Sequence, residues 1–176
     1  SFVNMEMNLK YPSYTGKESE TIRSTGNAMI PEGTKVSWKI SAKNTEAIKL
    51  QAEDTVYRFN YAENDFQFEK QLFQKFDYTL STSNKKLNDY ENLNYSIQII
   101  KDQYPEIEVQ SKVDSTNIER IFFFGSVSDD YGLSRLNLVY YPVGEEEKAK
   151  LEELPINRTT FDQFTFVFPG DLSLKQ

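Results

Sequence analysis

Apolar and polar residues alternate with a period of two along much of this chain, and this pattern constrains the fold more than any other feature. In the clearest stretch Val36, Trp38, Ile40 and Ala42 alternate with lysine and serine residues. Successive side chains of a β-strand point to opposite faces of a sheet, so the stretch predicts a strand with one buried face. We expect Trp38, the single tryptophan of the chain, to anchor a core.

The same alternation recurs through the first hundred residues, separated by polar turns such as Pro31-Glu32-Gly33. Seven or eight short strands with turns between them, roughly the pattern of an all-β domain, predict an antiparallel β-sandwich. The other alternating stretches are 5–11, 48–52, 57–61, 66–68, 76–80 and 95–99.

A tyrosine-proline pair divides the chain into two similar parts. Tyr11-Pro12 returns as Tyr104-Pro105, 93 positions later, a period close to the roughly 100 residues of one small β-sandwich domain. Charge also shifts there: residues 1–102 carry 13 Lys/Arg and 14 Asp/Glu, a net of −1, whereas residues 103–176 carry 7 and 13, a net of −6. We therefore predict two tandem β-sandwich domains, residues 1–102 and 103–176, with the boundary near Asp102.

The second part carries fewer strand signals than the first. Residues 107–109, 121–127, 136–140 and 164–168 predict strands, and residues 128–132 predict a turn. Residues 145–154 are the best helix candidate, because Glu145 and Lys148 have helical spacing and Pro155 would end a helix; an acidic loop is the other interpretation.

This amounts to about five strands, and a full sandwich of this type has about seven. We expect the second domain to be incomplete at its C-terminus, after a turn at Pro169-Gly170-Asp171. An incomplete domain leaves an unpaired strand edge, so edge-to-edge self-association is also expected.

Composition excludes several kinds of function. The chain has no histidine and no cysteine, which removes most catalytic nucleophiles and bases and all zinc sites built on these residues. A net charge of −7 without a basic stripe argues against nucleic-acid binding and against docking on anionic lipid. The longest apolar run, residues 121–124, is too short to span a bilayer. We predict a soluble fragment of a longer protein, without direct membrane contact.

Two short motifs suggest chemistry but have simpler structural readings. Asp129-Asp130 offers oxygen ligands for calcium, but it lacks the spacing of a calcium loop, and aspartates in turns usually cap backbone amides. Ser83-Asn84-Lys85-Lys86 fits S-x-x-K, but it lies in a polar stretch between strands rather than on a helix. We therefore predict no catalytic, cofactor-binding or metal-binding residue.

Four triplets and one aromatic row remain open to two readings. Tyr57, Phe59 and Tyr61 line one face of an expected strand and form either core or a sugar-stacking platform. The triplets match glycan acceptor patterns and equally well ordinary turns or strand ends. They are Asn94-Tyr95-Ser96, Asn157-Arg158-Thr159, Asp54-Thr55-Val56 and Asp114-Ser115-Thr116.

Several segments resemble modules of long bacterial membrane-anchored proteins of unknown function. The resemblance implies tandem immunoglobulin-like domains outside the cytoplasm, in a parent protein with membrane helices and a coiled region; it brings no catalytic residues. The matching segments are Tyr11-Pro12-Ser13-Tyr14-Thr15-Gly16, Ile30-Pro31-Glu32-Gly33-Thr34-Lys35-Val36-Ser37-Trp38, Tyr104-Pro105-Glu106-Ile107 and Ser128-Asp129-Asp130-Tyr131-Gly132-Leu133.

These observations predict a non-enzymatic spacer or protein-interaction module, located in the periplasm or at the cell surface as part of a larger anchored protein. No cofactor is expected, and the identity of a protein partner is open. The alternative is a carbohydrate-binding or adhesive β-sandwich, which an exposed aromatic row would favour. Exposed strand edges without a concave pocket would favour the interaction module.

Overall fold

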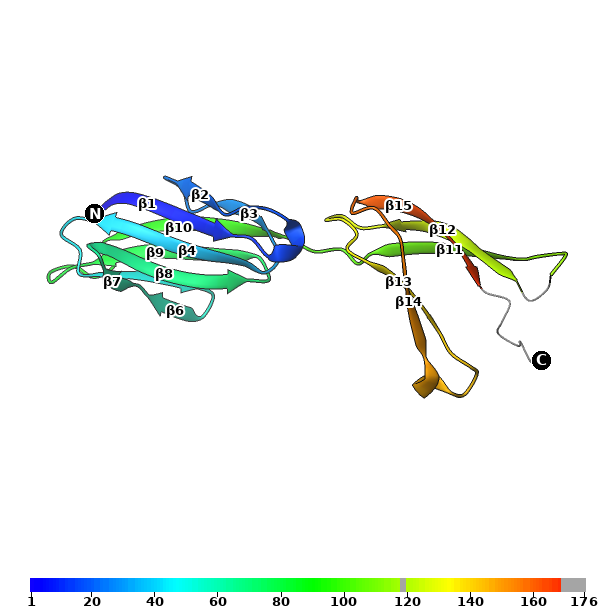
Figure 1. Cartoon of the computed structure of the whole chain (residues 1–176). Coiled ribbons are helices and arrows are strands. Elements are labelled where there is room, and N and C mark those ends of the chain that lie inside the picture. The colour runs from blue at the N-terminus through cyan, green and yellow to red at the C-terminus, as the bar shows by residue number, and fades with distance from the viewer. Residues whose placement is uncertain (118–119, 169–176) are drawn as a thin grey trace. The chain divides into compact units, whose positions relative to one another are not determined.

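The computed structural model describes residues 1–117 and 120–168, and nearly all of its regular structure is β-strand (Figure 1). The chain divides into two compact units, Ser1–Asp102 (unit 1) and Gln103–Gln176 (unit 2). The two helical segments of the described residues are single 3-10 turns, η1 (Ser13–Thr15) and η2 (Glu146–Lys148). Within these ranges no helix has the length and apolar character needed to cross a membrane.

Unit 1 consists of two five-stranded sheets. The first has the order β2 (Glu20–Arg23), β1 (Phe2–Lys10), β4 (Thr34–Ala42), β8 (Asp65–Leu72), β7 (Asn60–Ala62). The second has the order β3 (Ala28–Pro31), β10 (Glu91–Ile100), β9 (Phe76–Ser83), β5 (Ala47–Ala52), β6 (Thr55–Arg58).

The inner faces of these two sheets share one hydrophobic core, so unit 1 is a β-sandwich. Trp38 is only 1% exposed, and its ring lies 5.6 Å from Tyr78 on the opposite sheet and 5.7 Å from Phe68 on its own. The alternation in β4 therefore predicted the buried face correctly, and the prediction that Trp38 is a core residue is confirmed. A buried ring of this size is the largest apolar contribution that one side chain can make.

The predicted sandwich was antiparallel throughout, but β3 pairs with β10 in parallel. The chain leaves the first sheet after β2 and enters the second at β3, passing Gly26. A Cβ at Gly26 would lie 2.4 Å from the Tyr95 ring and 2.5 Å from the Tyr78 hydroxyl, so only glycine fits at this crossing. Strands β2 and β3 are four residues each and carried no alternation long enough to predict them.

The aromatic stretch 57–61 was expected to be one strand, and this was wrong. Tyr57 lies in β6 of the second sheet, whereas Tyr61 lies in β7 of the first. Phe59 lies between them, donates its amide to the carbonyl of Ile48 at 3.1 Å and is buried in the core. The stretch changes sheets because burial of the Phe59 ring in the shared core outweighs continuation of one strand.

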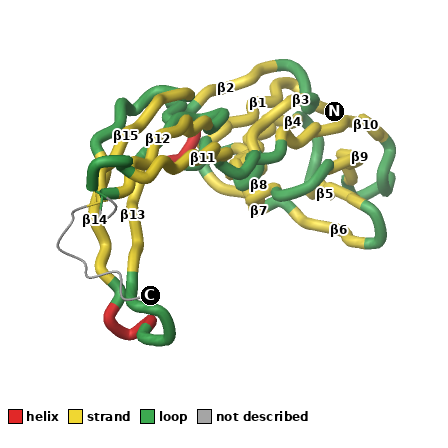
Figure 2. The backbone as a smooth tube through the Cα atoms, turned by 90° about the vertical axis from the view of Figure 1, so that its right-hand side faces the viewer, coloured by secondary structure: helices red, strands yellow, loops and turns green. Residues whose placement is uncertain are grey.

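Unit 2 has a three-stranded sheet and a separate hairpin. The sheet order is β11 (Glu106–Val113), β12 (Ile121–Ser128), β15 (Phe161–Phe168), all antiparallel. The hairpin joins β13 (Leu136–Tyr140) to β14 (Lys150–Leu154). Figure 2 shows the hairpin projecting away from the sheet, with η2 near its tip.

The helix expected at residues 145–154 is absent, because the second half of the stretch pairs with another strand. Only Glu146–Lys148 is helical, and residues 150–154 form β14. The Glu145–Lys148 ion pair that motivated the prediction does form, at the 3-10 turn. Cross-strand pairing of Leu154 with Leu136 then outweighs helix propensity, since Leu154 becomes buried. The turn expected at Pro169-Gly170-Asp171, and with it the expected incomplete end, lies outside the described residues.

The buried core of unit 2 is small. It comprises Val127, Leu133, Leu154 and Phe164, with Leu136, Leu138, Ile156 and Phe166 packed around it. The hairpin supplies several of these side chains, and the Tyr140 ring lies 4.9 Å from the Phe168 ring. The hairpin therefore covers that side of the sheet at β12 and β15.

Candidate functional site

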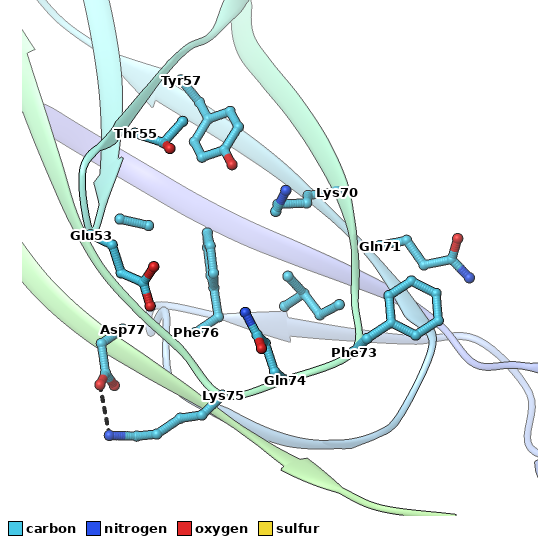
Figure 3. Close-up of a pocket in the computed structure, with 12 residues that line it drawn as sticks. Glu53, Thr55, Tyr57, Lys70, Gln71, Phe73, Gln74, Lys75, Phe76 and Asp77 are labelled. Atoms are coloured by element: carbon cyan, nitrogen blue, oxygen red, sulfur yellow. Dashed lines mark hydrogen bonds and ion pairs between the residues drawn. The ribbon is translucent and has the colours of Figure 1, made fainter.

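Unit 1 has a cavity of about 580 Å³ at one end of the sandwich. It lies between the β5–β6 turn, strand β6, the end of β8 and the loop that leads into β9 (Figure 3). Its walls mix rings with charged and amide side chains. The residues are Ala52, Glu53, Thr55, Tyr57, Lys70, Gln71, Leu72, Phe73, Gln74, Lys75, Phe76 and Asp77.

The Asp77 carboxylate, at the wall of this cavity, forms an ion pair with Lys75. The Lys75 ammonium donates to Asp77 at 2.6 Å, and the Ser96 hydroxyl donates to the other carboxylate oxygen at 2.6 Å. The bond from Lys75, followed by that from Ser96, lowers the pKa of the Asp77 carboxyl below its usual value. A carboxyl of this kind is ionised near neutral pH, so it is a poor general acid.

The aromatic rings near the cavity do not form a flat row. Tyr57 has the Lys70 ammonium 4.8 Å from its ring centroid, Phe59 is buried and Tyr61 packs on Phe66 in the other sheet. Phe73, which sequence reasoning missed, is exposed at the rim and labelled in Figure 3. It lies in a loop without alternation, so periodicity gave no signal for it. Tyr57, Phe73 and the half-buried Phe76 are the rings that line this cavity.

The S-x-x-K segment does not have the helical geometry that its chemistry uses. Ser83 is nearly buried at the end of β9, where its hydroxyl accepts the amide of Asp89 at 3.0 Å and donates to the Asp89 carboxylate at 3.2 Å. Lys86, the lysine of the motif, is exposed in the loop that follows, where its amide donates to the Asn84 carboxamide oxygen at 2.9 Å. The motif needs a serine and a lysine one helical turn apart, and this segment is a strand end followed by a loop.

The two aspartates considered for calcium have a structural role in the turn. Asp129 accepts the amide of Tyr131 at 3.1 Å, an interaction of the kind that aspartate makes in turns, while Asp130 is exposed. Across the described ranges 1–117 and 120–168, no group of three or more acidic side chains is arranged to hold a metal ion.

The glycan triplets also make ordinary local hydrogen bonds. The Asn94 carboxamide oxygen accepts from Thr79 at 2.7 Å across β9 and β10. The Asp114 carboxylate accepts both the amide and the hydroxyl of Thr116, at 2.8 and 2.7 Å. Asn157 and Thr55 lie at exposed positions. Both readings of these triplets therefore stay open.

The second candidate surface is the free edge of β11 in unit 2. β11 is the terminal strand of its sheet, and all eight of its residues are exposed. Ile107, Val109 and Val113 share one face and are 55%, 53% and 52% exposed. On the same face of the neighbouring strand, Val127 is buried. The apolar face of the sheet is thus covered at β12 and β15 but open along β11.

Comparison with protein-family models gave no match, and comparison with curated proteins gave none either. The resemblance to membrane-anchored bacterial proteins therefore stays a prediction.

Proposed function

We propose that this chain is a non-enzymatic spacer or protein-interaction module, made of two immunoglobulin-like domains, in a larger membrane-anchored protein outside the cytoplasm. The open β11 edge carries the interaction part of this proposal. An unpaired strand with three exposed aliphatic side chains on one face is a template for another extended chain.

The chemistry of the described residues supports a binding role. The chain has no histidine or cysteine, and hydrogen bonds lower the pKa values of the Asp77 and Asp114 carboxyls. Catalysis of proton transfer near neutral pH instead requires a group whose pKa lies close to the working pH.

Site-specific photo-crosslinking tests this proposal. A photoreactive amino acid replaces Val109 on β11, and in a matched control it replaces Val56 on edge strand β6 of unit 1, which is equally exposed at 52%. We expect a protein adduct at position 109 and none at position 56 when the chain is expressed in its own host. Equal labelling at the two positions, or no protein adduct at position 109, would contradict the interaction role.

The alternative function, carbohydrate binding, is favoured by one observation, the cavity with Tyr57 and Phe73. Rings beside charged and amide side chains can stack on a sugar and bond its hydroxyls. A glycan array tests this alternative. Binding that is lost in Phe73→Ala and kept in Phe161→Ala, an equally exposed ring in unit 2, would replace the interaction module with the carbohydrate-binding one.

A further inference from the structure

The direction of the backbone groups along β11 determines how another strand can join it. The amide of Asp114 donates to the carbonyl of Arg120 at 2.9 Å and extends the β11–β12 ladder by one pair. Hydrogen-bonded and non-hydrogen-bonded pairs alternate in an antiparallel ladder. The even-numbered residues of β11 therefore bond to β12, and the odd-numbered ones turn their N–H and C=O groups toward the free edge. The odd-numbered residues are Ile107, Val109, Ser111 and Val113.

A second copy of β11 can approach this edge only in certain registers. The outward-facing residues of one copy have to oppose outward-facing residues of the other for their N–H and C=O groups to pair. This condition also places odd residues opposite odd residues, so the open apolar faces of the two sheets become continuous. The two copies are then related by a two-fold axis perpendicular to the sheet.

Charge selects one of the remaining registers. When Val109 of each copy lies on the axis, Glu106 opposes Lys112 of the second copy twice, and the two Val109 side chains oppose each other. Centring on Gln110 instead places Glu108 opposite Lys112, but it also places Glu106 opposite Asp114. Centring on Ser111 places Glu108 opposite Asp114. Opposite charges and apolar pairs directly across a ladder stabilise it, whereas like charges oppose it.

From this complementarity we infer that β11 binds β11 of a second copy of this chain, antiparallel and centred on Val109. The pairing joins two three-stranded sheets into one of six strands and places the Val109 side chains of the two copies side by side. It deepens the proposed function, on which it rests, by giving the interaction surface a partner.

Other edges of the described residues fit a second copy less well. The edge strands of unit 1, which are β2, β7, β3 and β6, have only three or four residues each. β15 is long enough, but its single charged residue is Asp162, so a copy of β15 offers it no opposite charge. β13 and β14, the two strands of the hairpin, have five residues each. β11 alone among these edge strands combines eight residues with both charge signs in a self-complementary order.

A cysteine introduced at position 109 tests the register, because the chain has no cysteine of its own. In the inferred pairing Val109 opposes itself in a hydrogen-bonded pair, with Cα atoms about 5.5 Å apart, which is within disulfide reach. Val109→Cys should form a covalent dimer under mild oxidation. In the Ser111→Cys control the two Cα atoms lie about 13 Å apart along the strand, so this variant should form no disulfide under the same conditions.

Charge reversal tests the same pairing without a covalent bond. Glu106→Lys and Lys112→Glu should each weaken the dimer on the order of tenfold, because each change replaces two attractive cross-strand pairs with two repulsive ones. The double variant Glu106→Lys/Lys112→Glu restores both pairs and should recover the affinity of the original chain. Sedimentation over a range of protein concentrations measures all four chains. All of the substituted side chains are exposed, so the fold should tolerate the changes.

The outcomes separate this inference from the proposed function. A covalent dimer at position 109 but not at 111, together with rescue in the double variant, supports the inference. Equal cross-linking at both positions, or a double variant as weak as the single ones, overturns it. If a photoreactive residue at position 109 labels a different protein while Val109→Cys forms no covalent dimer, the interaction role survives and self-pairing fails. If Val109→Cys forms the covalent dimer while the adduct pattern at 109 and 56 is equal, the self-pairing holds and the wider interaction role fails.

Discussion

The two units of this chain differ in the length of the strands at the edges of their sheets. In unit 1 the four edge strands have three or four residues each, whereas in unit 2 both edges of the main sheet are strands of eight residues. Short edges limit pairing with other chains. The difference teaches that similar alternation can build a self-contained sandwich or a sheet that still offers an edge.

The cores differ in the same sense. Sixteen buried hydrophobic residues from both sheets close the interior of unit 1, but only four residues form the buried cluster of unit 2 within the described ranges. The Tyr-Pro pairs follow this contrast: Tyr104 is 93% exposed, while Tyr11 bonds Glu20 at 2.8 Å. Partial burial, together with this carboxylate, raises the pKa of Tyr11 to about 12.

The largest predicted effect concerns the core of unit 1. Trp38→Ala should lower the free energy of unfolding of unit 1 by about 3–5 kcal/mol, because it removes a buried ring and leaves a cavity between the sheets. Amide exchange measured peptide by peptide should show the loss in β4, β8 and β9, with β12 and β15 unchanged. An equal loss in unit 2 would contradict the division between the units, and an unchanged unit 1 would contradict the placement of Trp38.

The next effect concerns the polar group inside that core. The Trp38 indole N–H donates to the Tyr78 hydroxyl at 3.0 Å, and this hydroxyl donates to the carbonyl of Gly26 at 2.7 Å. Tyr78→Phe leaves both partners unsatisfied and should cost about 1–3 kcal/mol. Urea unfolding followed by the fluorescence of Trp38 measures this directly.

A matched control for this change is Tyr61→Phe, in which the altered ring is exposed on β7. It should move the free energy of unfolding by about 0.5 kcal/mol or less. Equal effects of the two variants would mean that the Tyr78 hydroxyl does not hold the crossing at Gly26.

A smaller effect concerns surface carboxylates of unit 1. The Ser41 hydroxyl, and after it Lys39, lowers the pKa of the Asp65 carboxyl. A lowered pKa in the folded state gives stability that is present above the unfolded value of about 4 and is lost as pH falls through the folded value. Asp65→Asn should therefore destabilise unit 1 at pH 7, by roughly 1 kcal/mol or less. This gap in stability between the variant and the original chain should close below about pH 4.

Thermal unfolding at several pH values measures this gap. Asp54→Asn, an exposed substitution in the turn between β5 and β6, is the control and should change the stability at pH 7 less than Asp65→Asn does. A gap for Asp65→Asn that widens toward low pH would contradict the sign of the pKa change.

Strands with one buried face were predictable from sequence, because their alternation follows directly from burial. This holds for β1, β4 and β9, whose odd or even residues enter the core of unit 1. The change of sheet at Phe59 and the parallel β3 were not predictable, since both depend on contacts between the sheets. The prediction of a helix at residues 145–154 was wrong. The local charge spacing favours a helix, whereas β14 forms by pairing with β13, and no local pattern indicates that pairing.

The candidate surfaces were predictable only in part. Alternation identified a strand around Ile107 and Val109, but the direction of its backbone groups follows from the register with β12. The cavity beside Phe73 arises where the β8–β9 loop meets the β5–β6 turn, and residues so far apart in sequence carry no shared signal.

Amide exchange along β11 tests the central claim that this strand is an open edge which a second copy occupies. In dilute solution the amides of Ile107, Val109, Ser111 and Val113 should exchange fast, while those of Glu108, Gln110 and Lys112 should be protected by β12. Raising the protein concentration should slow exchange at the odd positions and leave β4 of unit 1 unchanged. Uniform protection along β11 at every concentration, or fast odd-position exchange that no concentration slows, would contradict the account.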